Sequence, residues 1–114
     1  MSTSVHITTE RQYRQLVNEI SDLTPLDEVF DRLDEISYYT NFSGKLGRLY
    51  DVIDQFSRFE DEFTREFAYI GYTGSVKMLE HAVASLDSAD VYRKWDLIID
   101  RFENEDKLVI LVDV

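Results

Sequence analysis

The chain has 114 residues, of which 44% are hydrophobic and 13% aromatic, so it is long enough to form one domain with its own core and too apolar to be disordered. It contains no cysteine, which excludes disulfides, thiol chemistry and cysteine-bound zinc. The 23 acidic and 12 basic residues give a net charge of −11, which opposes direct binding to nucleic acids or anionic membranes and favours a basic partner. Because no signal-peptide or membrane-length apolar run is visible, we expect a cytoplasmic protein.

The first third of the chain predicts a short strand and two helices. Residues 5–7 alternate as in an edge strand, and Thr9 begins a capping-box sequence at the start of a helix over 10–21. The only proline, Pro25, suits the first turn of a second helix. Five apolar residues then recur at the spacing of a buried stripe, namely Leu26, Val29, Phe30, Leu33 and Ile36. The segment 37–47 that follows combines polar residues with glycine and is predicted to be an irregular break.

The centre of the chain, residues 46–70, predicts one long amphipathic helix. It has no proline, and its single glycine, Gly47, lies near its start. Apolar residues recur in two seven-residue series, formed by Leu46, Leu49, Ile53, Phe56, Phe63, Phe67 and Ile70. At about 1.5 Å per residue such a helix would be roughly 37 Å long. Glu60 stands where the series requires an apolar residue, which makes it either a surface edge or part of a site.

The C-terminal third predicts a turn, two helices and a buried strand. Residues 71–75 contain two glycines and are expected to form the turn, and helical spacing then covers 76–86 and 91–104. Residues 108–112 are all apolar, which is typical of a strand buried on both faces. A lone strand is not stable, so it must pair with residues 5–7, with a strand that the spacing hides, or with a second copy of the chain.

Together these elements predict a mainly α fold of about five helices around the long central helix. Short N- and C-terminal strands can pair, which makes the fold α+β by strict count. The chain, 1–114, is expected to be a single small acidic helical domain.

No constellation for catalysis or cofactor binding is visible. His6 and His81 lack zinc-ligand spacing, and no nucleophile elbow, phosphate loop or EF-hand loop is present. The only adjacent basic pair is Arg93-Lys94, too little for a nucleic-acid site. We therefore predict no enzyme activity, no catalytic residue, no cofactor and no metal site.

The acidic residues of the second and central helices are the candidates for partner binding. The second helix has five acids against Arg32, and Asp27, Asp31 and Glu35 follow one another at a spacing where like charges cost stability. In the central helix, Asp54–Arg58 and Asp61–Arg65 are spaced as i,i+4 ion pairs. The candidate set is Asp27, Asp31, Asp34, Glu35, Glu60, Asp61, Glu62 and Glu66.

Two functions from different classes follow from these features. Carboxylates one helical turn apart lie about 6 Å from each other, near the spacing of phosphates along a nucleic-acid strand. This favours a non-enzymatic inhibitor of a basic, nucleic-acid-handling protein, either a DNA mimic of the anti-restriction or anti-CRISPR kind or an immunity protein against a nuclease toxin. The alternative is a homodimeric structural or regulatory domain that pairs through its C-terminal strand, with the acidity serving solubility only.

Overall fold

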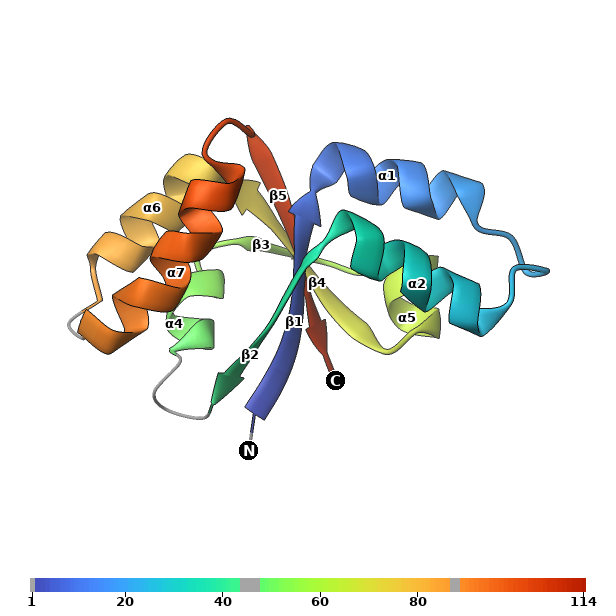
Figure 1. Ribbon diagram of the computed structural model, residues 1–114, viewed down its shortest axis with the longest axis horizontal. Coiled ribbons are helices and arrows are strands. Elements are labelled where there is room, and N and C mark those ends of the chain that lie inside the picture. Colours follow the sequence, from blue (N-terminus) through green and yellow to red (C-terminus); the bar gives the residue numbers. More distant parts are fainter. Residues whose placement is uncertain (1, 44–47, 87–88) are drawn as a thin grey trace.

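The protein is built on one antiparallel sheet of five strands with helices on both faces (Figure 1). The structure is a computed structural model that describes residues 2–43, 48–86 and 89–114. The sheet order is β2-β1-β5-β4-β3, and all neighbouring strands are antiparallel. The strands are β1 (Ser2–Thr9), β2 (Tyr38–Ser43), β3 (Ser57–Phe59), β4 (Tyr69–Ser75) and β5 (Lys107–Asp113).

The helices form two layers, one on each side of the sheet (Figure 1). The first layer consists of α1 (Glu10–Glu19), α2 (Leu26–Ile36) and α5 (Glu62–Glu66). The second consists of α4 (Leu49–Ile53), α6 (Val76–Ala84) and α7 (Ala89–Phe102). Each layer encloses its own hydrophobic core against the sheet, so the sheet is buried from both sides.

The central strand β5 is buried on both faces, as the sequence predicts. Leu108 and Ile110 belong to the core under α4, α6 and α7, whereas Val109 and Leu111 belong to the core under α1, α2 and α5. β5 pairs with β1 on one side and with β4 on the other. The two terminal strands therefore do pair, but as the inner strands of a larger sheet.

The prediction of a mainly α fold around one long helix is wrong. Residues 49–70 form α4, β3, α5 and the start of β4, while 46 and 47 lie outside the described residues. The spacing misleads because the aromatic residues divide between the two cores: Phe56 packs in one and Phe63 in the other. A new helix also begins inside the segment, because Asp61 forms a capping box with Thr64.

The predicted turn at 71–75 is also wrong, because these residues lie in strand β4. Its two glycines make room for aromatic rings. A Cβ atom on Gly71 would lie 2.5 Å from the Phe59 ring, and one on Gly74 would lie 2.8 Å from the Phe56 ring. Similarly, the predicted break over 37–47 contains the edge strand β2 up to residue 43, and residues 44–47 lie outside the described part.

The fold contains two units with the same order of elements, strand–helix–helix–strand. They are β1-α1-α2-β2 and β4-α6-α7-β5, and in each unit the closing strand is the antiparallel neighbour of the first. Each first strand also runs directly into a hydroxyl-capped helix, since Thr9 accepts from the Gln12 amide and Ser75 from the Met78 amide, both at 3.1 Å. The helical pairs lie on opposite faces of the sheet (Figure 1).

The packing of Phe56 against β4 gives a test of the central segment. Replacing Gly74 with alanine is expected to destabilise the fold by about 1–3 kcal/mol, because the added Cβ would meet the base of a buried ring. The exposed residue Ser57 on the adjacent strand is the control, and S57A is expected to stay within about 0.5 kcal/mol of wild type. Urea unfolding measures both. A G74A variant as stable as S57A would contradict this packing.

Candidate partner-binding surface

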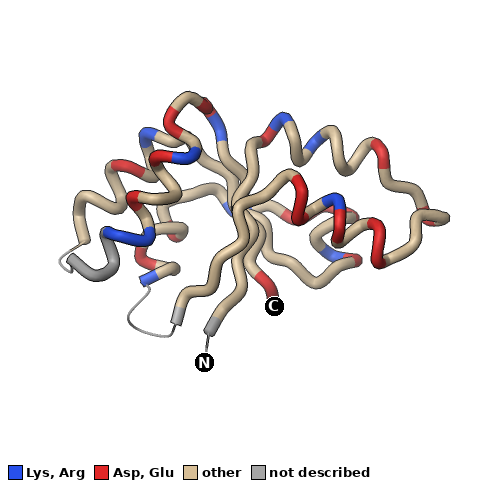
Figure 2. The backbone as a smooth tube through the Cα atoms, in the orientation of Figure 1, with Lys and Arg blue, Asp and Glu red and all other residues tan. Residues whose placement is uncertain are grey.

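Negative charge is concentrated on α2 (Figure 2). This helix carries five acids and one base, whereas α1, α6 and α7 each carry equal numbers of acids and Lys or Arg residues. Among the helices the excess of acids is therefore largest on α2, since α4 and α5 each carry only one more acid than bases.

The acids of α2 are exposed and mostly unneutralised. The candidates Asp27, Asp31, Asp34 and Glu35 all face solvent. The helix's one base, Arg32, binds Glu28 at 3.1 Å and Glu19 of α1 at 3.2 Å, on the flank that faces α1. Within the described residues, Asp27, Asp31 and Glu35 have no ion pair.

Apolar side chains are exposed beside these acids. Leu26 and Phe30 were expected in the buried stripe of the second helix, but they are 55% and 36% exposed, so this expectation is wrong. Leu23, in the turn before α2, is 92% exposed. Phe30 packs edge-to-face on Phe67 at a centroid distance of 5.9 Å, which joins α2 to the end of α5. Exposed apolar residues next to unneutralised acids are typical of an interaction surface.

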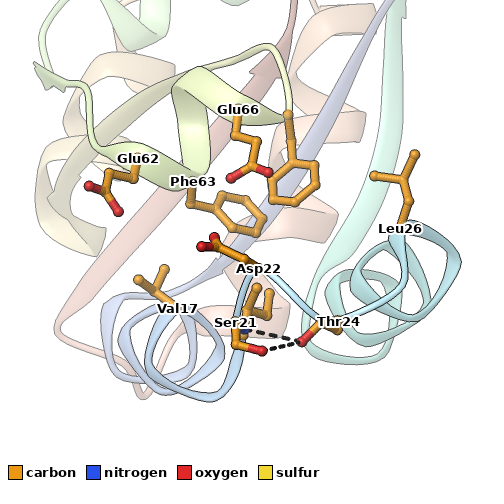
Figure 3. A pocket seen from close by; sticks show the side chains of 10 residues that line it. Val17, Ser21, Asp22, Thr24, Leu26, Glu62, Phe63 and Glu66 are labelled. Atoms are coloured by element: carbon orange, nitrogen blue, oxygen red, sulfur yellow. Dashed lines mark hydrogen bonds between the residues drawn. The ribbon is translucent and has the colours of Figure 1, made fainter.

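The candidates Glu62 and Glu66 lie on α5, where they help to line a cavity of about 200 Å³. The opposite wall comes from the α1–α2 turn and contributes Asp22, so acidic side chains from two elements line the same cavity (Figure 3). The rest of the lining consists of five apolar residues, Val17, Ile20, Leu26, Phe63 and Phe67, and of Ser21 and Thr24. We call the exposed residues of the turn, α2 and α5 the acidic face; it comprises Asp22, Leu23, Leu26, Asp27, Phe30, Asp31, Glu35, Glu62 and Glu66. Glu35 lies at its edge, beside Arg32 in the groove between α1 and α2.

The α1–α2 turn is fixed by local hydrogen bonds. The Ser21 amide donates to the Thr24 hydroxyl at 3.1 Å, the Thr24 amide donates to the Ser21 carbonyl at 3.0 Å, and the Leu23 amide donates to the Ser21 hydroxyl at 3.3 Å. The Thr24 hydroxyl serves this turn and does not cap α2, because Pro25 occupies the cap position. Asp22 is therefore held on the rim of the cavity by a defined turn.

Asp61 and Glu60 have different positions from the other candidates. The Asp61 carboxylate accepts from the Tyr13 hydroxyl at 2.6 Å and from the Thr64 amide at 2.9 Å, so it joins α1 to the start of α5. Burial, and then this bond to Asp61, raises the pKa of Tyr13 well above its usual value. Glu60 is exposed in the connection between β3 and α5. Because this residue is not part of a helix, the apolar side chain that the seven-residue series requires is not needed there.

The ion pairs expected in the central segment do not form. Asp54 follows the last turn of α4 and Arg58 lies on β3, so no helix brings them together. Asp61 is the cap of α5 and has no ion pair with Arg65 within the described residues. The acids of this segment are thus less compensated than the spacing implies.

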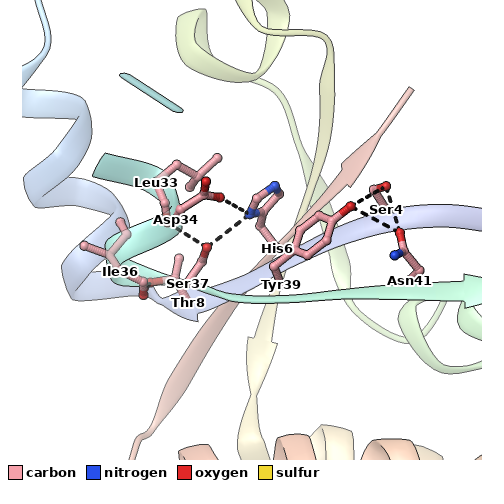
Figure 4. Close-up of polar contacts among 9 residues, drawn as sticks. All are labelled: Ser4, His6, Thr8, Leu33, Asp34, Ile36, Ser37, Tyr39 and Asn41. Carbon is pink, nitrogen blue, oxygen red and sulfur yellow. Dashed lines mark hydrogen bonds and ion pairs between the residues drawn. The ribbon is translucent and has the colours of Figure 1, made fainter. Parts of the chain in front are cut away.

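His6 forms a polar cluster with the end of α2 that sequence reasoning did not identify (Figure 4). Its Nδ1 lies 3.1 Å from the Ser37 hydroxyl and 3.8 Å from Asp34 Oδ1. The Ser37 hydroxyl donates to a carbonyl of α2 at 2.6 Å, so its oxygen accepts from His6 Nδ1–H. The sequence offered one signal: His6 lies between the apolar residues Val5 and Ile7 in an alternating strand, so its side chain is expected on the opposite face of the sheet from theirs.

Comparisons with known proteins find no counterpart: no protein-family model, no curated protein and no solved structure matches the chain. Across the residues that the structure describes, no helix has the length and apolar character to cross a membrane. Across the same residues, no group of three or more His, Asp or Glu side chains is placed to hold a metal ion.

The link between α1 and α5 through Asp61 predicts a cost for removing one hydroxyl. Tyr13→Phe keeps the buried ring but loses the bond to a charged acceptor, so we expect a loss of about 1.5–3 kcal/mol of stability in urea unfolding. Tyr50, which is half exposed and whose hydroxyl has no hydrogen-bond partner among the described residues, is the matched control. A Y13F variant no less stable than Y50F would show that the bond contributes nothing.

The environment of His6 predicts a pH dependence. Burial lowers the pKa of His6 below 6.5, and the charges of Asp34 and Asp113 only partly oppose this effect. The unfolded chain then binds this proton more readily, so stability falls as pH drops from about 6.5 through the lowered folded-state pKa. An NMR titration of the His6 ring should give a midpoint below 6.5, and D34N should lower it further. A midpoint at or above 6.5 would refute the prediction.

Proposed function

We propose that the protein is a non-enzymatic inhibitor that binds a basic surface of a nucleic-acid-handling protein through its acidic face. The observation that carries this proposal is the combination on one face of unneutralised acids with exposed Leu23, Leu26 and Phe30. Binding surfaces commonly pair a desolvated apolar centre with a polar rim. The acids of the rim would steer a basic partner and exclude acidic ones.

The arrangement on α2 favours partners that normally bind nucleic acid. Asp27, Asp31 and Glu35 follow one another by one helical turn along the exposed side of the helix, and this spacing is near that of phosphates on a strand. A groove that accepts a nucleic-acid backbone would therefore also accept this helix. DNA mimics of the anti-restriction or anti-CRISPR kind and immunity proteins against nuclease toxins both fit the proposal, with action in the cytoplasm.

The dimer alternative was based on a C-terminal strand without enough partners within the chain, and this basis is removed by the pairing of β5. The C-terminal strand β5 is hydrogen-bonded to β1 and to β4, so neither of its edges is free to pair with a second copy. No other feature of the described residues favours a symmetric assembly over binding of a basic partner.

Capture with matched charge reversals tests the proposal. The bait variants are D27K/D31K/E35K on the acidic face and E80K/D96K/D100K on the opposite layer, where the three acids are also exposed. Both variants change the net charge by the same amount. Proteins captured from nuclease-treated cell extract are then purified, and their affinity for each bait is measured as a function of salt.

The expected prey is a basic nucleic-acid-handling protein that wild type and the opposite-layer variant bind equally. The α2 reversal should weaken binding about 100-fold or more, because juxtaposed like charges cost several kcal/mol. Wild type should also inhibit the prey's action on nucleic acid, and duplex DNA or RNA should compete with it. Equal binding by both reversals, or prey without a basic surface, would overturn the proposal.

A further inference from the structure

We propose that the cavity between the α1–α2 turn and α5 receives one arginine side chain of the partner. This inference rests on the proposed function and narrows it from a charged surface to an anchor residue. The cavity has a mixed lining: apolar side chains, including the rings of Phe63 and Phe67, stand beside the carboxylate side chains of Asp22, Glu62 and Glu66 (Figure 3).

The occupant must satisfy two opposite demands. The apolar lining residues favour an aliphatic or aromatic-stacking group, while the carboxylates favour a cation, since no basic residue lines the cavity. Glu62 and Glu66 stand at i,i+4 on α5, where two like charges repel each other and a cation between them would relieve the repulsion. A long side chain with an apolar stem and a positive head meets both demands.

Arginine fits the cavity better than lysine. Its planar guanidinium stacks on aromatic faces such as that of Phe63 and can form paired hydrogen bonds with a carboxylate. Because three carboxylates from two elements line the cavity, a group with several N–H donors suits it better than a single donor. A lysine ammonium offers a point charge without stacking or paired geometry.

Both walls of the cavity are held before any partner arrives. The turn that bears Asp22 is fixed by the Ser21–Thr24 hydrogen bonds, and α5 is fixed to α1 by the Tyr13–Asp61 bond. A preformed site reduces the entropy lost on binding. The exposed side chain of Leu23 adjoins the cavity in sequence and would be covered by the surface around the inserted arginine, as is typical of an interface anchor.

A titration with small probes tests the cavity without the partner. Amide NMR spectra of the labelled protein are followed with N-acetyl-arginine methylamide, with the lysine equivalent, and with the citrulline equivalent, which is the neutral isostere of arginine. The arginine probe should give saturable shifts at Val17, Phe63 and Phe67, with a Kd on the order of millimolar. The lysine probe should bind several-fold more weakly, and the citrulline probe should give no saturable shift.

Charge-neutralising variants complete the test. E62Q/E66Q should weaken the arginine probe about tenfold or more while its spectrum stays that of a folded protein, and E80Q/D96N on the opposite layer should bind as wild type does. Equal binding of citrulline, unsaturable shifts spread over all exposed acids, or unchanged affinity of E62Q/E66Q would each overturn the inference.

The same variants separate this inference from the proposed function. If a captured basic partner loses affinity with the α2 reversal but not with E62Q/E66Q, the cavity assignment fails while the function stands. If the arginine probe binds saturably but no basic partner is captured, the cavity assignment stands and the function fails.

Discussion

The architecture depends on one constraint, which is that the central strand β5 must be buried on both faces and paired on both edges. Five consecutive apolar residues, 108–112, cannot lie at the surface of a sheet, so helices must cover both sides. The two strand–helix–helix–strand units meet this requirement by sending their helical pairs to opposite faces. β1 comes from the first unit and β4 from the second, and together they leave no open edge on β5.

Local sequence signals were sufficient for long helices with one buried face and for a strand that is apolar throughout. The four helices α1, α2, α6 and α7 and the buried strand β5 were recognised from spacing and caps. The central segment failed because its short elements serve both cores, so Phe56 and Phe63 fit one seven-residue series while facing opposite sides of the sheet. Glu60, the one acidic residue in that series, lies in the connection between β3 and α5, where the predicted helix is interrupted. Strand β4 was missed since glycines that accommodate neighbouring rings look like turn residues in sequence.

The candidate surface was predictable in its charge but not in its assembly. The uncompensated acids of α2 could be read from the sequence because their spacing is local. Asp22 could not be added to Glu62 and Glu66, because only tertiary packing brings the turn to α5. The exposure of Leu26 could not be predicted from the sequence either. The first turn of α2 lies toward the outer end of its layer, away from the strands (Figure 1), so Leu26 is exposed although it belongs to the apolar stripe of the helix.

The uneven distribution of charge supports the proposed binding role of the acidic face over a role in solubility alone. Charge that only keeps a protein soluble is not expected to concentrate on one helix, because an acid at any exposed position contributes equally to solubility. Here α1, α6 and α7 are balanced while α2 is strongly acidic, and like charges one turn apart on α2 destabilise it. Internal roles account for Asp61, which caps α5, and in part for Asp34, which lies near His6. The acids without such roles lie beside exposed Leu26 and Phe30, so a cost in stability coincides with a surface suited to binding a basic partner.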